Sequence, residues 1–307
     1  MRNQIKTILL LGVLSALLVA LGAAISPAAF WLMAVVALAM NLGAYFFSDR
    51  IVLRMHGARE VTPGELPRLR AMVDELSARA GIPAPRLFVM EEDQPNAFAT
   101  GRSPRRGVVA LTRGILHLLD ERELRGVVAH ELAHIRNRDI LLSTIAAAAA
   151  AAVGGVANAL QLSTLFGGSE EEGGSSGVGA LAMAFVAPIA ALFVQLGISR
   201  SREYLADETG ARLSGDPEAL ACALEKLALG AEASPLAVAP ATSSLFIVNP
   251  LAGEGRGQRL AAWLSTHPPI EERVRRLRTL AWGAAVGVPR VHPGHRRTEA
   301  RRAGAWS

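Results

Sequence analysis

Long apolar runs alternate with polar segments along this chain. Residues 8–25 and 28–48 contain no charged side chain, and each run is long enough to cross a bilayer as a helix. Only Ser26 and Pro27 separate them, which leaves room for a turn but not for a domain. The first run exceeds a typical secretory signal and continues into a second apolar run, so we expect it to be retained. The pattern therefore predicts an N-terminal membrane hairpin over residues 1–48.

A second pair of apolar runs lies deeper in the chain, at residues 140–166 and 178–198, on either side of a Gly/Ser/Glu-rich loop at 167–177. The first of these runs is rich in alanine, which inserts less readily than leucine, and the second contains Pro188. A long soluble helical hairpin is therefore the alternative. We expect residues 140–198 to form a second membrane hairpin.

The distribution of arginine and lysine predicts the orientation of both hairpins. Basic residues gather at their polar ends, at positions 2, 6, 50, 54, 59, 136, 138, 200 and 202. The two short loops at the opposite ends contain no basic residue, and the second holds three glutamates at 170–172. Because cytoplasmic loops carry the excess of Lys and Arg, we expect both termini and both large polar segments on the cytoplasmic side of the inner (plasma) membrane.

Two polar segments, residues 49–139 and 199–285, are interpreted as two parts of one cytoplasmic catalytic domain. The arginine-rich end, residues 286–307, has little apolar surface to bury and is expected to be a disordered basic tail. No aromatic interleaving or nucleic-acid-binding module accompanies these arginines, so we expect no nucleic-acid partner. The single cysteine excludes an internal disulfide and fits a reducing compartment.

Residues 130–134 read His-Glu-Leu-Ala-His, the strongest chemical motif in the chain. On a helix, His130 and His134 lie one turn apart on the same face, so both imidazoles can bind one Zn²⁺. Glu131 is placed to polarise a metal-bound water instead of binding the metal. Asp120 as N-cap with Glu123 three residues later predicts where the helix begins. The alternative is a pair of surface histidines on an ordinary helix.

A catalytic zinc normally takes three protein ligands, so a third must come from elsewhere. The metzincin pattern is excluded because positions 137 and 140 hold Asn and Ile. We therefore look for a glutamate on a second helix, and the segment 201–207 fits best. Glu203 and Asp207 share a helical face there, so Glu203 can bind the metal while Asp207 accepts the free N–H of a ligating imidazole. The alternative is a surface helix with an ordinary Arg202/Glu203 charge pattern.

The second hairpin would place the segments that contain His134 and Glu203 next to each other. His134 lies six residues before Ile140, about 9 Å along a helix, and Glu203 lies five residues after Ile198, about 7.5 Å. Antiparallel helices of a hairpin bring their ends side by side. We therefore expect one Zn²⁺ per chain, just inside the bilayer surface, in an active site that faces the membrane.

Short strands are expected at Arg86–Glu91, Asn96–Thr100 and Gly107–Thr112, the last two on either side of a basic turn at 102–106. Together with the helical segments, they predict a mainly α, α+β integral membrane protein. It would have about four transmembrane helices and a zincin-like catalytic domain that contains a small β-sheet.

At this point the chain resembles the HtpX family of membrane-bound zinc metalloproteases, within the broader gluzincin group. The resemblance extends from about residue 3 to residue 280. It rests on the paired N-terminal spans and on four motifs: Asn96-Ala-Phe-Ala-Thr-Gly101, His130-Glu-Leu-Ala-His134 with Asn137 and Asp139, Ser201-Arg-Glu-Tyr-Leu-Ala-Asp207, and Thr266-His-Pro-Pro269.

The resemblance implies zinc bound by His130, His134 and Glu203, with Glu131 as general base and acid. It also implies cleavage of membrane proteins on the cytoplasmic side, as part of envelope quality control under stress. In proteases of this kind an edge strand beside the zinc helix pairs with the extended substrate. We assign that role to Asn96, Ala97, Phe98 and Ala99, the alternative being a sheet that only supports the zinc helix.

His267 is a further candidate, since it could stabilise the oxyanion of a tetrahedral intermediate. The alternative is structural: Thr266 would cap a helix whose first turn contains Pro268 and Pro269. Four other histidines have no partner at ligand spacing and are interpreted as surface residues: His56, His117, His292 and His295.

The predicted reaction is hydrolysis of a peptide bond without ATP, because neither Lys6 nor Lys226 follows a glycine and no P-loop exists. Two alternative functions are less consistent with the sequence. Processing of prenylated C-terminal peptides is disfavoured because related enzymes have more membrane helices. A zinc-stabilised scaffold that binds partners without cutting them is disfavoured by Glu131, because a structural zinc site usually fills its fourth position with a protein ligand.

Overall fold

The computed structural model describes residues 26–146, 200–233, 242–249 and 268–285, with six isolated positions between 12 and 23. Most of the first expected membrane run lies outside the described residues, as do residues 147–199 of the second hairpin and the basic tail at 286–307.

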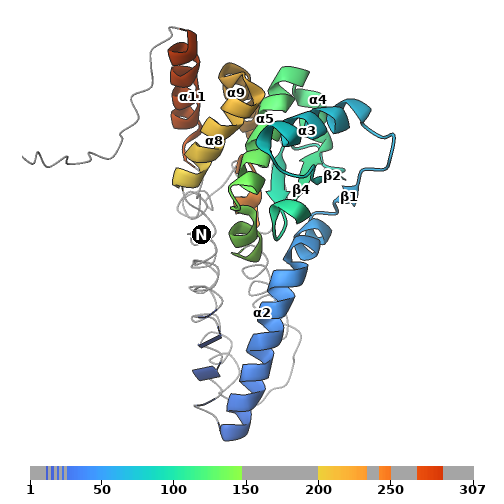
Figure 1. The fold of residues 1–307 in the computed structure, drawn as a ribbon, viewed down its shortest axis with the longest axis vertical. Coiled ribbons are helices and arrows are strands. Elements are labelled where there is room, and N and C mark those ends of the chain that lie inside the picture. The colour runs from blue at the N-terminus through green and yellow to red at the C-terminus, as the bar shows by residue number, and fades with distance from the viewer. Residues whose placement is uncertain are drawn as a thin grey trace, which may run out of the picture.

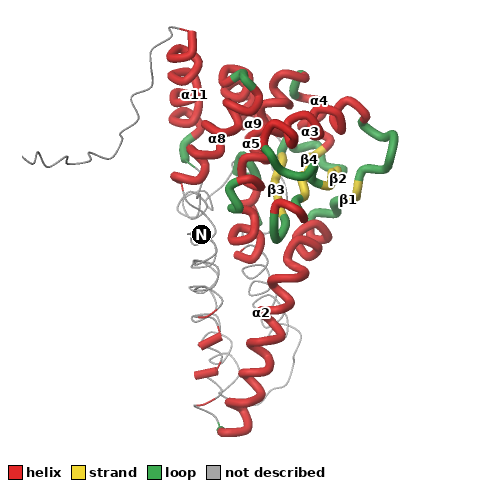
Figure 2. The backbone as a smooth tube through the Cα atoms, in the orientation of Figure 1, coloured by secondary structure: helices red, strands yellow, loops and turns green. Residues whose placement is uncertain are grey.

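A mixed four-stranded sheet lies on one side of the folded domain (Figure 2). Its order is β1 (Arg59–Glu60), β2 (Arg86–Met90), β4 (Val108–Thr112) and β3 (Ala97–Thr100). β2 and β4 run parallel, whereas β1 and β3 pair antiparallel with their neighbours. The three predicted strands are confirmed to within one residue at each end. β1 was not predicted, because two residues carry no periodic signal.

Both faces of this sheet are buried, and successive residues alternate between two cores. Val109 and Leu111 of β4 face the larger core, which the helices of the domain complete. Val108 and Ala110 face a smaller core on the other side, which includes Val52 from the last turns of an N-terminal helix. The strands therefore read as continuous apolar runs.

The longer helices that contribute to the larger core are α3 (Pro67–Ala80), α5 (Glu121–Arg136), α8 (Arg200–Ser214), α9 (Pro217–Ala233) and α11 (Ile270–Ala285), all labelled in Figure 1. Of these, α8, α9 and α11 lie on the side of the domain opposite the sheet (Figure 2). The short helix α4 (Arg113–Leu118) adds Ile115 to this core. Two 3₁₀ turns complete the described elements: η1 (Pro104–Arg106), between β3 and β4, and η2 (Ser243–Leu245), between α9 and α11. The prediction of a mainly helical protein with a small sheet is confirmed.

The N-terminal helix α2 (Pro27–Met55) extends away from the sheet, as Figure 1 shows. Ser26 caps it by accepting a hydrogen bond from the N–H of Ala29, and Pro27 occupies the first turn, where no N–H is needed. The helix continues seven residues beyond the apolar run predicted to end at position 48. Among the described residues, no single helix is long and apolar enough to cross a membrane. The two halves of α2, which meet at a bend of 63° beside Ala44, have the length and composition to do so together.

Candidate metal centre

Helix α5 carries the His-Glu-Leu-Ala-His motif, and its start is the one expected from the sequence. The Asp120 side chain accepts from the backbone N–H of Glu123, and the Glu123 carboxylate accepts from the N–H of Asp120. This capping box fixes the helix two and a half turns before the motif. His130 and Glu131 are buried, whereas His134 is partly exposed.

Helix α8 crosses α5 at very short range. A Cβ atom on Gly210 would lie only 2.8 Å from the backbone N and Cα of His130, so only glycine permits this approach. Glu203 lies two turns before Gly210 and on the same face, and the crossing therefore brings its carboxylate to the imidazoles. Arg202 and Glu203 are both buried, so the interpretation of this segment as an ordinary surface helix is wrong.

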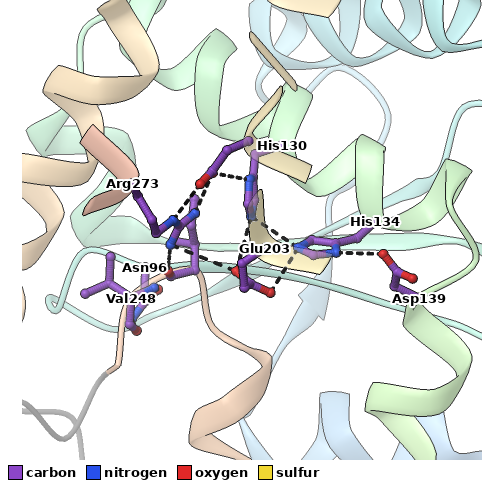
Figure 3. Close-up of polar contacts among 9 residues, drawn as sticks. Asn96, His130, His134, Asp139, Glu203, Val248 and Arg273 are labelled. Carbon is purple, nitrogen blue, oxygen red and sulfur yellow. Dashed lines mark hydrogen bonds and ion pairs between the residues drawn. The ribbon is translucent and has the colours of Figure 1, made fainter. Parts of the chain in front are cut away.

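Three donor atoms converge between the two helices (Figure 3). The Nε2 atoms of His130 and His134 are 3.2 Å apart. Glu203 Oε1 lies 3.6 Å from Nε2 of His134, and its Oε2 lies 3.9 Å from Nε2 of His130. Two ligands of a tetrahedral Zn²⁺, each about 2.1 Å from the ion, lie about 3.4 Å apart. The three donors therefore have the spacing of a His₂Glu zinc site, as the sequence predicts.

The opposite ring nitrogens are turned toward carboxylates. Nδ1 of His130 lies 3.0 Å from Oδ1 of Asp207, and Nδ1 of His134 lies 3.4 Å from Oδ2 of Asp139. Such partners favour a proton on each Nδ1, so the Nε2 lone pairs face each other. Two lone pairs at 3.2 Å repel, so the arrangement needs either a proton on one Nε2 or a metal cation between the rings. The chemistry of the donor set therefore fits Zn²⁺.

The charges around this centre shift several pKa values in opposite directions. Burial lowers the pKa of His130, against the effect of Asp207. For His134 burial acts in the same direction, but the carboxylate of Glu203, with Asp139 and Glu131, outweighs it and raises the pKa to about 9. Burial raises the pKa of Glu131 to about 7, and the Glu203 carboxylate adds to this effect. A carboxyl group with a pKa near neutrality suits a proton acceptor and donor.

Arg273 of α11 is the principal counter-charge of the site. It is completely buried, and its Nε and Nη2 donate to the two carboxylate oxygens of Asp207 at 2.8 and 2.7 Å. A third hydrogen bond runs from Nη1 to the carbonyl of Ile247 at 2.9 Å, and Nη1 lies 4.0 Å from Oε2 of Glu203. Burial opposes ionisation of Asp207, but Arg273 outweighs it and lowers the pKa of Asp207 to about 2. Asp207 is therefore ionised beside His130.

The predicted substrate strand forms the free edge of the sheet as β3, but part of that edge is already used. The carbonyl of Ala97 accepts from the N–H of Ile247 at 3.0 Å. The Asn96 amide donates to the Val248 carbonyl at 2.9 Å and its oxygen accepts from the Val248 N–H at 3.4 Å (Figure 3). The next outward-facing N–H, that of Ala99, lies close enough to the Glu131 carboxylate to lower its pKa. Only the Ala99 end of this edge therefore lies beside the metal centre.

Other predicted residues have different outcomes. His267 lies outside the described residues, and α11 begins at Ile270, just after Pro268 and Pro269. His56 is not a free surface residue, because its ring packs edge-on against Phe246 with centroids 5.1 Å apart. His117 is exposed, as expected, and His292 and His295 lie outside the described residues.

Sequence reasoning missed the roles of three residues at this centre. Gly210 lies on the same helical face as Glu203 and Asp207, and this spacing in the sequence could have predicted that it contacts the zinc helix. Arg273 shares the buried face of α11 with Val274 and Leu277. An arginine among apolar residues of one helical face could have been predicted to be buried and paired with a carboxylate. Asp139 follows the zinc helix at a turn, and no local pattern shows which histidine it faces.

Comparisons with known proteins identify the family of this chain. Residues 63–281 match Peptidase family M48. A protein named Protease HtpX homolog from Syntrophobacter fumaroxidans is 49% identical over 286 residues, covering 91% of this chain and 100% of that relative. One of the same name from Pelotomaculum thermopropionicum is 50% identical over 283 residues, covering 91% and 99%. A crystal structure of S. mikatae Ste24p is similar with a TM-score of 0.45 and 19% identity, covering 81% of this chain and 58% of that chain.

Proposed function

Because this chain belongs to the HtpX group of Peptidase family M48, we propose that it cleaves membrane proteins at sites on the cytoplasmic side of the inner membrane, without ATP, as a quality-control protease. The chain is a membrane zinc metalloendopeptidase whose metal site consists of His130, His134 and Glu203. The observation that carries the proposal is the convergence of these three donors beside the buried carboxylate of Glu131.

Zn²⁺, when bound, supplies Lewis-acid chemistry that polarises a scissile carbonyl and makes water acidic enough to lose a proton near neutral pH. Glu131 accepts that proton and passes it to the leaving amine, a role for which its buried carboxylate beside the metal donors is suited. Asp207 and Asp139 hold the two imidazoles in one orientation, and Arg273 keeps Asp207 ionised.

The substrate backbone is proposed to pair with the Ala99 end of β3. This end lies beside Glu131, whereas Ile247 already covers the Ala97 end. In this proposal, the substrate role first assigned to Asn96, Ala97, Phe98 and Ala99 is limited to Ala99. Phe98 points into the smaller core, where its ring contacts Phe246.

The membrane placement belongs to the same proposal. It comprises two hairpins, residues 1–48 and 140–198, a catalytic domain divided between 49–139 and 199–285, and a basic tail at 286–307, with both termini in the cytoplasm. The described part of the first hairpin supports it, because a stripe of large apolar side chains on α2 is exposed: Trp31, Val35, Leu38 and Leu42.

The experiment is proteolysis by the full chain purified in detergent. Casein is incubated with the protein as isolated, after removal of metal with a chelator, and after zinc is restored. We expect cleavage that is lost with the metal, returns with zinc and does not change when ATP is added. A single-span substrate reconstituted with the enzyme tests the finer claim. A zinc-loaded protein that cleaves neither substrate would indicate the scaffold function instead.

Replacing a ligand removes the metal. We expect His130→Ala and Glu203→Ala each to lower bound zinc from about one per chain to near zero, because two donors do not hold a catalytic zinc. Elemental analysis of the purified variants measures this ratio. Glu208→Ala is the matched control, since Glu208 is on the same helix but forms an ion pair with Arg212. Full zinc occupancy in Glu203→Ala would contradict the ligand set.

Zinc affinity is expected to rise with pH up to about 9. In the metal-free site the pKa of His134 is raised to about 9, so this imidazole is protonated at neutral pH. Because the metal binds only the neutral ring, each unit of pH below this value lowers the apparent affinity about tenfold. Competition with a chelating indicator between pH 6.5 and pH 9 measures the slope. A flat profile would show that His134 is already neutral.

A further inference from the structure

The second half of α2 has a face that the catalytic domain does not cover. Ser48, Val52 and Leu53 are buried, the last two against the sheet. On the other side, five residues follow at helical spacing and are all exposed: Phe46, Phe47, Arg50, Ile51 and Arg54. This face combines aromatic, aliphatic and cationic side chains, and it continues the apolar stripe of the first half.

The direction of the helix changes where this face begins. The segment Tyr45–Met55 is bent by 63° from Pro27–Gly43. If the first half stands along the bilayer normal, the second half lies closer to the plane of the membrane than to the normal. Aromatic residues and arginines on one side of such a helix are typical of the level of the lipid headgroups.

Arg50 on this face and the neighbouring Arg102 each contact an aromatic ring. The guanidinium carbon of Arg50 lies 5.7 Å from the ring centroid of Phe47, and that of Arg102 lies 5.1 Å from that of Phe46. Within the described ranges, no Asp or Glu forms an ion pair with Arg50, Arg54 or Arg102. Many arginines elsewhere on the domain are paired, for example those at 59, 86, 113, 122 and 125. Among the described residues, no carboxylate therefore competes with an external anion for these cations.

Arg102 connects this face to the active site. It follows β3 directly, three residues after Ala99, whose N–H faces Glu131. At the same end of β3, the Thr100 hydroxyl lies 2.8 Å from that of Thr144, which is near the start of the second expected hairpin. The part of the edge that is proposed to receive substrate therefore ends beside two segments directed toward the membrane.

We propose that the exposed face of Tyr45–Met55, together with Arg102, is an interfacial surface that binds anionic phospholipid headgroups of the bilayer in which the chain is anchored. Phe46, Phe47 and Ile51 enter the headgroup region, and the arginines bind lipid phosphates. This contact sets the height of the β3 edge above the bilayer, so that a substrate leaving the membrane meets the edge at its Ala99 end. The inference rests on the membrane placement proposed above.

Depth measurements test the contact itself. Cys222 is the only cysteine, so Cys222→Ser provides a background for single nitroxide labels at Phe47→Cys or at Leu229→Cys, an exposed apolar position on α9. In nanodiscs of phosphatidylcholine and phosphatidylglycerol, we expect the label at 47 to be more accessible to oxygen than to a water-soluble nickel complex, and the label at 229 to show the reverse. Water accessibility at 47 equal to that at 229, or protection from both reagents, overturns the proposal.

Lipid dependence tests the role of the arginines. In nanodiscs of phosphatidylcholine with phosphatidylglycerol, at about 3:1, the wild type should cleave a single-span substrate about fivefold or more faster than in phosphatidylcholine alone. Arg50→Gln/Arg102→Gln should lose this difference, whereas Arg68→Gln, on an exposed α3 position, should keep it. A double variant that retains the lipid dependence overturns the proposal. Casein cleavage in detergent should not change in any of these variants. The zinc dependence of casein cleavage tests the proposed function separately from the lipid contact.

Discussion

Glu131→Gln is expected to lower the turnover of peptide substrates about 10²- to 10⁴-fold while zinc content stays at the wild-type level. Glutamine has the size of glutamate and keeps a carbonyl oxygen that can face the N–H of Ala99. It cannot accept the proton of an attacking water, so proton transfer to the leaving amine is lost. The metal ligands are unchanged, which separates this variant from a substitution at His130 or Glu203.

The measurement combines kcat on a fluorogenic peptide with zinc per chain on the same preparation. Glu121→Gln is the matched control, because Glu121 is exposed in the first turn of the same helix and should leave both values unchanged. Activity near that of the wild type in Glu131→Gln would remove this carboxylate from the mechanism. Loss of zinc as well as activity would instead indicate that Glu131 helps to hold the metal.

Arg273→Met is expected to destabilise the protein by about 3–5 kcal/mol and to weaken zinc binding. Arg273 is completely buried and donates twice to Asp207, so its removal leaves that carboxylate and Glu203 in the interior without their counter-charge. Methionine fills most of the space of the arginine side chain. The loss of stability is therefore expected to come from the lost charge and hydrogen bonds more than from a cavity. Thermal unfolding in detergent and zinc titration measure the two consequences.

A second substitution distinguishes this electrostatic role from simple packing. Arg273→Met/Asp207→Asn removes the unpaired charge, so it should regain part of the lost stability, although not the orientation of His130. Arg276→Met, on the same helix but exposed and paired with Glu272, should have a small effect. If Arg273→Met unfolds at the wild-type temperature, the ion pair makes no net contribution to the free energy of unfolding.

Local patterns in the sequence determined much of the catalytic half of the molecule. The capping box of Asp120 and Glu123, the histidine pair one turn apart and three strands of continuous apolar character all depend on neighbours within a few residues. Glu203 was also predicted, because two expected membrane segments gave a physical reason for α5 and α8 to meet. Long apolar runs, caps and helical spacing are short-range signals, and for this reason a sequence can display them.

Only the tertiary structure decided which groups surround the metal ligands and which part of the sheet edge is free. Asp207 meets Arg273 across 66 positions of the chain, and Asn96 meets Val248 across 152. Contacts of this kind depend on how closely helices pack, as at Gly210 against His130. The local sequence around either residue does not determine that distance. The sequence by itself therefore determined the zinc chemistry, its helices and the apolar runs. The packing of α8 and α11 against α5 decided the counter-charge, the orientation of the imidazoles and the place left for substrate.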